Sequence, residues 1–411
     1  MGAEKKASWI PTAPLAADGA KHLQRPAPPL ARLHTQAVHA GEARPHLAGA
    51  LSMPLFHSST YLFSEACAFD DIAYGRLNNT PNQQAVSRKL AALMGAEAAV
   101  VTPSGTAAIY AALSTALEPG DHVLVQREVY SGTRKIFTHL AKARGVTLHF
   151  VDVRQPESWP VIDAGCAKLF YCDALSNPTL IVPHYGAIVR HCRRHGLLSV
   201  VDNTVLGPVN FQPLALGFDL ELHSASKSLN GHADVVAGVV AGQRERVEGI
   251  RRHLNAVGMC LDPQACFLLQ RGLKTLVLRV ERQCATAQRL ATWLESRPAI
   301  AKVHYPGLAS CPGHGLATRW LRTPGALVSF EPEGDATRAE TILRRLQLVQ
   351  IAPSFGGVES LACRPAETSH AGLPEALKRE LGAVPNLIRL SVGLEALEAL
   401  QADLEQALSS T

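Results

Sequence analysis

Short apolar runs alternate with amphipathic segments between about residues 96 and 242. Short runs rich in Val, Ile and Leu are typical of buried strands, and apolar residues three or four positions apart are typical of helices. The predicted strands are Ala98–Thr102, His122–Gln126, Thr147–Val151, Lys168–Cys172, Leu197–Val201, Leu220–His223 and Val235–Val240, and the predicted helices are Ser104–Leu117, Thr133–Arg144 and Tyr185–His195. This βαβα alternation predicts an α/β fold with a mostly parallel sheet covered by helices.

The pattern changes after about residue 245. Long helical patterns cover Asp262–Arg271 and Thr275–Glu295, short strands are predicted at Ala301–Tyr305, Ala326–Phe330 and Leu387–Val392, and a closing helix at Leu394–Leu408. We therefore predict a second, smaller α+β domain. The predicted organisation is a disordered leader over residues 1–30, an irregular N-terminal arm over 31–75, a large domain over 76–273 and a small C-terminal domain over 274–411.

Composition narrows the class of protein. A chain of 411 residues with 47% hydrophobic and 18% charged residues is typical of a globular enzyme. The net charge of +5 is modest, and the arginine-rich segments lie in helical patterns, so we expect solvated faces and no nucleic-acid partner. No apolar run approaches the ~18 residues that a membrane span needs. Nine scattered cysteines without a CxxC pair predict neither a metal site nor a disulfide framework, and they suit a cytoplasmic protein.

Two charged residues stand near the ends of predicted strands. Asp202 follows Val200-Val201, and Lys227 follows the segment Leu222-His223-Ser224-Ala225-Ser226. Open α/β sheets bind ligands at the carboxyl ends of their strands, so these groups and the serine hydroxyls are expected there. A lysine that forms a Schiff base, hydroxyls that hold a phosphate and an acid that keeps a pyridine nitrogen protonated are what pyridoxal phosphate (PLP) requires. Ser-x-Ser-Lys alone is a weak signal, and an ordinary surface lysine is the alternative.

A turn at the end of the first predicted strand offers a phosphate site. In Thr102-Pro103-Ser104-Gly105-Thr106 a strand ends, glycine permits a close backbone approach, and a helix begins at a serine cap. The free N–H groups at a helix N-terminus suit a phosphate. A plain capped helix is the alternative, and the chain contains no GxGxxG or P-loop sequence.

Three further residues are candidates for contacts with a cofactor or a substrate. Tyr130 follows the next strand and either stacks on a flat ring or belongs to the core. Asn177 precedes Pro178, which is a turn signal, one strand before Asp202. Arg389 lies inside an apolar strand pattern, where a buried charge needs a partner. That partner is either a substrate carboxylate, which a guanidinium binds in bidentate fashion, or a structural carboxylate.

Together these residues resemble the Cys/Met-metabolism PLP enzymes, the family of cystathionine γ-synthases and lyases, methionine γ-lyases and homoserine sulfhydrylases. The resemblance covers about residues 34–410 and is most specific at His223-Ser-Ala-Ser-Lys227-Ser-Leu-Asn-Gly-His232-Ala-Asp234, with Asp202-Asn-Thr upstream. It implies an aspartate aminotransferase-like (fold type I) large domain and a homotetramer built from active-site dimers.

The resemblance also implies roles for individual residues. Lys227 is then the Schiff-base lysine and proton shuttle, Asp202 pairs with the pyridinium nitrogen, and Tyr130 stacks on the ring. The phosphate is held by Ser224, Ser226 and the backbone of Gly105 and Thr106, and by Tyr74 and Arg76 of a neighbouring subunit. The remaining implied contacts are from Asn177 and Thr204 to the cofactor, and from Ser354 and Arg389 to the substrate.

The variable positions bear on the reaction. Gly231–Asp234 favours the synthase and lyase branch over sulfhydrylases, and Ile351–Ser360 is most similar to γ-synthases. γ-Lyases often carry an acidic residue where Pro353 stands, and the stretch Tyr74–Asn82 departs from the commoner Asn-Pro-Thr pattern. Our primary hypothesis is a PLP-dependent replacement at Cγ of an activated homoserine ester by a thiol. The alternatives are a lyase that cleaves a thioether amino acid, a relative that forms a carbon–carbon bond at Cγ, and a non-catalytic PLP-binding protein.

Overall fold

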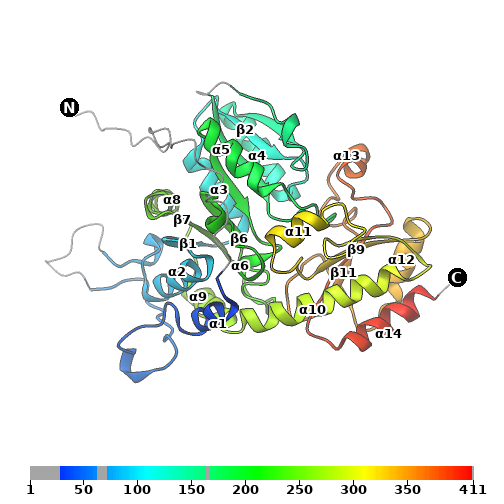
Figure 1. The fold of residues 1–411 in the computed structure, drawn as a ribbon. Coiled ribbons are helices and arrows are strands. Elements are labelled where there is room, and N and C mark those ends of the chain that lie inside the picture. Colours follow the sequence, from blue (N-terminus) through cyan, green and yellow to red (C-terminus); the bar gives the residue numbers. More distant parts are fainter. Residues whose placement is uncertain (1–27, 63–71, 163–165, 410–411) are drawn as a thin grey trace.

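A seven-stranded sheet forms the centre of the larger part of the molecule (Figure 1). The computed structural model describes residues 28–62, 72–162 and 166–409. The strands lie in the order β1-β7-β6-β5-β4-β2-β3. Their bounds are β1 Ala98–Thr102, β2 His122–Gln126, β3 Thr147–Val151, β4 Ala167–Asp173, β5 Leu198–Asp202, β6 Leu220–Ser224 and β7 Gly238–Gly242.

Strand β7 is antiparallel to both of its neighbours, β1 and β6, and the other pairs are parallel. The predicted mostly parallel sheet is thus confirmed. The strand expected at Val235–Val240 begins later, at Gly238. The reason is local, because both backbone groups of Ala237 bond the Ser226 hydroxyl, and Gly238 then passes so close to the Ser104 carbonyl that a Cβ would not fit.

Helices cover both faces of this sheet (Figure 1). One face packs against α3 Gly105–Ala116, α4 Ser131–Arg144 and α8 Arg244–Val257, and the other packs against α5 Tyr185–His195. A third apolar cluster joins β1 and β7 to α1 Leu30–His39, α2 Pro81–Met94 and α9 Pro263–Leu273. Short helices α6 Gly207–Asn210 and α7 Pro213–Leu216 connect β5 to β6.

The C-terminal part of the chain, which we call the small domain, contains a smaller five-stranded sheet in the order β10-β11-β12-β9-β8. The predicted domain boundaries stay a prediction. Its pairs are antiparallel except β10 with β11. The bounds are β8 Ile300–His304, α11 His314–Trp320, β9 Leu327–Pro332, α12 Ala336–Arg345, β10 Gln350–Ile351, β11 Leu361–Cys363, α13 Glu375–Glu380, β12 Ile388–Ser391 and α14 Leu397–Leu408. Helix α10 Leu276–Glu295 links the two parts: its first half packs into the large-part core and its second half packs with the small sheet.

In its described residues, the segment predicted as an irregular arm contains one α-helix, α1. A buried lysine holds the last turn of this helix: Lys89 Nζ donates to the carbonyls of Ala37 and Val38, at 2.9 and 3.1 Å, and lies 3.4 Å from Glu42 Oε1. Burial lowers the pKa of Lys89 to about 8, although Glu42 opposes the change. The predicted leader lies outside the described residues, apart from residues 28–30.

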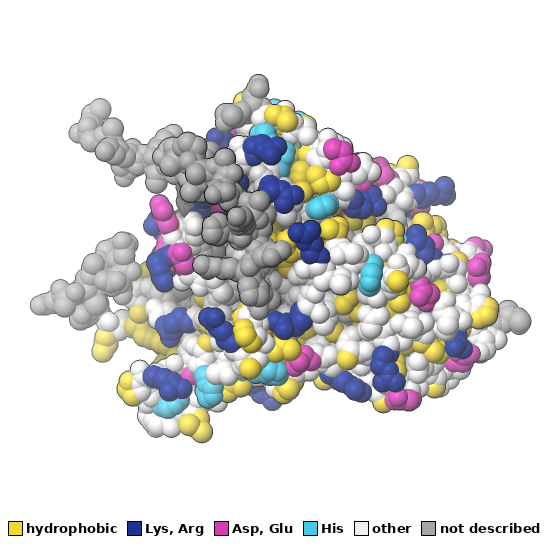
Figure 2. Space-filling view, viewed as in Figure 1, with side chains coloured by type: hydrophobic (Ala, Val, Ile, Leu, Met, Phe, Trp, Pro, Cys, Tyr) yellow, Lys and Arg dark blue, Asp and Glu magenta, His cyan; other side chains and the backbone are white. Residues whose placement is uncertain are grey.

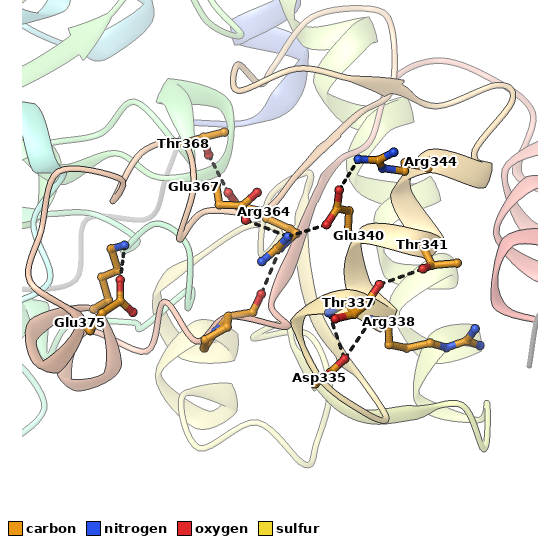
Figure 3. A network of polar contacts seen from close by, with 12 residues as sticks. Asp335, Thr337, Arg338, Glu340, Thr341, Arg344, Arg364, Glu367, Thr368 and Glu375 are labelled. Atoms are coloured by element: carbon orange, nitrogen blue, oxygen red, sulfur yellow. Dashed lines mark hydrogen bonds and ion pairs between the residues drawn. The ribbon is translucent and has the colours of Figure 1, made fainter.

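Charged side chains are spread over the surface (Figure 2), and some of them form ion pairs. On the face shown in Figure 2, basic side chains are interspersed with acidic and apolar ones. Figure 3 shows buried Arg364 between Glu367 and Glu340 of α12, with guanidinium-to-carboxylate distances of 2.8 and 3.9 Å. Arg364 Nε also donates to the Pro385 carbonyl at 3.1 Å. This arginine therefore fixes the chain after β11 against α12.

Candidate active site

The acid at the end of β5 and the serine at the end of β6 are joined through one hydroxyl. Thr204 donates to Asp202 Oδ1 from both its backbone N–H and its Oγ1, and Thr204 Oγ1 accepts a bond of 2.8 Å from the Ser224 N–H. Tyr171 OH lies 3.5 Å from the other carboxylate oxygen. Burial raises the pKa of Asp202, and the bonds from Thr204 oppose this rise. These donors stabilise a carboxylate at the carboxyl edge of the sheet.

A narrow cradle forms where α3 begins. Ser104 Oγ accepts the Ala107 N–H at 3.0 Å and so caps the helix. A Cβ on Gly105 would lie 2.6 Å from Ser224 Cβ, so only glycine allows this approach. The N–H groups of Gly105 and Thr106 are among the first of the helix and have no intrahelical partner, which suits a bound phosphate. The hydroxyl of Ser226 bonds both backbone groups of Ala237 instead, so its phosphate contact stays a prediction.

Residues from the small domain surround the lysine. Lys227 Nζ donates to Ser354 Oγ at 2.8 Å and lies 4.9 Å from the centroid of the Phe355 ring. Burial, assisted by the nearby positive charge of Arg389, lowers the pKa of Lys227 to about 8. A lysine with this pKa can serve as a base near neutral pH, because about a tenth of it is uncharged at pH 7, far more than for an ordinary lysine.

Arg389 is almost completely buried, with 2% of its surface exposed. Its Nη1 donates to Asn177 Oδ1 at 3.1 Å, and its Nη2 donates to the carbonyls of Pro353 and Ser354 at 2.8 and 2.9 Å. Within the described residues, its Nε is buried without a hydrogen-bond partner. A guanidinium that has no carboxylate partner among the residues the structure describes, and whose Nε–H is buried without an acceptor there, fits a substrate carboxylate. Burial lowers the pKa of Arg389.

Tyr130 stands at the start of α4, and 42% of it is exposed. Its backbone N–H donates to Asp173 Oδ2 at 3.0 Å, and its ring lies against Gly132, where a Cβ would collide with the ring edge. Since the ring is exposed and the Tyr130 backbone is held by Asp173, the ring is available to stack on a flat ligand.

The contacts of Tyr74 and Arg76 are not with the residues around Lys227. Arg76 Nη1 donates to the Asn255 carbonyl of α8 at 2.7 Å, and its guanidinium lies 5.8 Å from the Tyr74 ring centroid. Tyr74 is 40% exposed. Their contact with the phosphate bound by a neighbouring subunit stays a prediction, as does the homotetramer.

Two residues next to the site were not predicted from the sequence. Asp173 ends β4 beside Asp202, and Phe355 lies under both Lys227 and Arg389. Asp173 carries a usable signal, because it ends an apolar run in the same way as Asp202. Phe355 carries no such signal, because its place depends on how the small domain packs.

Known proteins identify the family. The model of the Cys/Met metabolism PLP-dependent enzymes matches residues 34–409. The chain belongs to this family. It is 37% identical to the cystathionine beta-lyase of Coxiella burnetii, over 92% of this chain and 97% of that protein. It is 36% identical to the L-methionine gamma-lyase of Pseudomonas putida, with coverages of 92% and 97%. The solved cystathionine gamma synthase of Xanthomonas oryzae pv. oryzae is similar with a TM-score of 0.87 and 35% identity, over 92% of this chain and 97% of that one.

Membership confirms the fold class, the PLP cofactor and the assignment as an enzyme of sulfur amino-acid metabolism. The residues present fit PLP: the glycine cradle leaves room for a phosphate, and the donors of Thr204 favour the ionised form of Asp202, which a pyridinium requires. Bound PLP supplies an electron-withdrawing ring that makes the Cα proton of an amino acid removable. No helix in the described part of the chain is long and apolar enough to cross a membrane.

Proposed function

We propose that this enzyme replaces the γ-substituent of an activated homoserine ester by a thiol. In that reaction the Cγ–O bond breaks, a carboxylate leaves with the bonding electrons, and the thiol sulfur gives up its proton as it forms a Cγ–S bond. The protein must bind the amino acid by its carboxylate and move protons at Cα and Cβ. Lys227 and Arg389 are the groups that support these two tasks.

Lys227 is proposed as the base because its position and its pKa both suit proton transfer. Its Nζ is held by Ser354 Oγ at 2.8 Å, which fixes the direction of the flexible side chain. Since its pKa is lowered to about 8, the amine can take a proton from Cα and return it elsewhere on the same substrate.

Arg389 is proposed to hold the substrate carboxylate. Asn177 and the carbonyls of Pro353 and Ser354 fix the guanidinium plane from two sides. Ser354 therefore contacts both proposed functional side chains: its hydroxyl accepts from Lys227 and its carbonyl accepts from Arg389. This link sets the distance between the substrate carboxylate and the base.

The observation that favours replacement is the neutral residue at position 353. The Pro353 carbonyl accepts from Arg389, and a proline side chain supplies no charge to the substrate pocket. Burial and the positive charge of Arg389 lower the pKa of Lys227, and no carboxylate contributes to this shift. The acyl chain of a homoserine ester carries no ammonium group, so this substrate needs no acid at position 353. The similar Xanthomonas γ-synthase supports the same activity.

Product analysis tests the proposal. Purified holoenzyme is incubated with O-acetyl- or O-succinyl-homoserine and cysteine, and the products are separated by mass spectrometry. We expect a thioether amino acid as the main product, with solvent deuterium at Cα and Cβ when the reaction runs in D₂O. Formation of 2-oxobutyrate and ammonia alone, with no thioether at any cysteine concentration, rejects replacement.

The second candidate is a lyase that cleaves a carbon–sulfur bond, and the names of the relatives favour it. Both the Coxiella and the Pseudomonas proteins are called lyases and match over 92% of this chain. Incubation with cystathionine or methionine alone distinguishes the two functions, since a lyase needs no second substrate. Rapid release of a keto acid, ammonia and a thiol from either compound supports this candidate.

A further inference from the structure

A second carboxyl group lies beside Asp202 and takes no part in the mechanism above. Asp173 ends β4 as Asp202 ends β5, and the two residues are register partners in parallel strands. Their side chains therefore leave the sheet in the same direction, at neighbouring positions. Asp173 is buried, with 6% of its surface exposed.

The two acids have different hydrogen-bond environments. Asp202 has three possible donors, namely the Thr204 N–H, the Thr204 hydroxyl and the more distant Tyr171 hydroxyl. Asp173 accepts one bond, from the Tyr130 N–H, and within the described residues its Oδ1 is buried without a partner. Two adjacent carboxyls, one buried and one half-buried, cannot both ionise cheaply, so the charge resides where more donors stabilise it. Burial and the charge of Asp202 raise the pKa of Asp173 well above its ordinary value.

The backbone around Asp173 is fixed as well. Its N–H donates to the buried Gln126 side chain at 2.9 Å, and the next N–H, of Ala174, donates to the Asp202 carbonyl at 2.8 Å. The carboxyl group is thus held in place where it accepts the N–H of Tyr130, the residue before α4.

We propose that Asp173 is a positioning residue, a neutral acid that fixes Tyr130 over the cofactor ring and leaves the negative charge to Asp202. It acts on the ring through the Tyr130 backbone, and the missing Cβ at Gly132 leaves the space that the tyrosine ring occupies. This inference rests on the cofactor roles of Tyr130 and Asp202. It is independent of whether the enzyme catalyses replacement or elimination.

The test measures how fast diluted holoenzyme loses its cofactor, and the circular dichroism of the bound cofactor in the visible region. For Asp173→Ala we expect release faster by about fivefold to a hundredfold, the effect of one buried hydrogen bond, together with a weakened dichroic band. Asp173→Asn keeps an acceptor for the Tyr130 N–H without a charge, so it should restore both values to within about threefold of the wild type. Cys172→Ala is the matched control, because it truncates the preceding buried residue of the same strand, which points to the opposite face.

A double-mutant cycle with Tyr130→Ala separates positioning from a loss of general stability. If Asp173 acts through Tyr130, Asp173→Ala should speed release little further once the tyrosine ring is absent. Equal effects of Asp173→Ala in both backgrounds would overturn the proposal, as would an Asp173→Asn variant that is as impaired as Asp173→Ala. Since the readout is cofactor release, a failed product assay leaves this test unaffected.

Discussion

Arg389→Lys tests whether the buried guanidinium holds the substrate carboxylate. Arginine has five N–H donors, and three of the hydrogen bonds it can form go to the protein, at 2.8 to 3.1 Å. A lysine ammonium has only three donors, so keeping the protein contacts leaves none for the substrate. A hydrogen bond to a charged group contributes about 1.5–3 kcal/mol, so KM should rise by about 10- to 150-fold.

The assay is steady-state kinetics on purified holoenzyme with the substrate found by product analysis. The cofactor content and the melting temperature are measured on the same preparations. Arg364→Lys is the matched control, because Arg364 is a buried arginine of the same domain whose partners are Glu340, Glu367 and the Pro385 carbonyl (Figure 3). A KM for Arg389→Lys within about threefold of wild type, with full cofactor content, would refute a direct role in substrate binding.

Three more outcomes are expected. Lys227→Ala should abolish turnover, and borohydride treatment of this holoenzyme should leave no cofactor covalently attached, whereas an adduct on another side chain contradicts the assignment. Gly105→Ala places a Cβ 2.6 Å from Ser224 Cβ and should speed cofactor release at least about tenfold, while Gly315→Ala, with nothing within 4 Å of its added Cβ, should not. The pKa of Lys89 is about 8 in the folded chain against an ordinary 10.5, so this group makes folding more favourable as pH rises from 8 to 10.5, by up to about 3 kcal/mol. Denaturation at several pH values should show this rise in the wild type, and an equal rise in Lys89→Met contradicts it.

The sequence predicted the parts of the site that are carried by local elements. Asp202 and Ser224 each end an apolar run, and the structure has both at the ends of parallel strands. The carboxyl ends of parallel strands share one edge, so a strand pattern is enough to bring these residues together. The cap at Ser104 was visible for the same reason, because a serine before a helical pattern forms its bond within one turn.

Other local structure was missed where the pattern is weak. Helix α1 lies within the segment predicted as an irregular arm, and only two of its residues, Leu33 and Ala37, are buried. A helix that buries so narrow a stripe gives little periodic signal. Its position is set by distant groups, such as the buried amine of Lys89 that holds the carbonyls at its end.

By itself the sequence determined the alternation of strands and helices, the lysine, the acid and the family. Only the tertiary structure decided what surrounds them. Ser354, Phe355 and Arg389 meet Lys227 because α10 joins the cores of both domains and the small sheet places β12 against the large one. Contacts between residues more than a hundred positions apart depend on this packing, and no periodicity in the chain encodes them. The pairing of Asp173 with Asp202 follows likewise from strand order, since parallel neighbours become partners only when the sheet has formed.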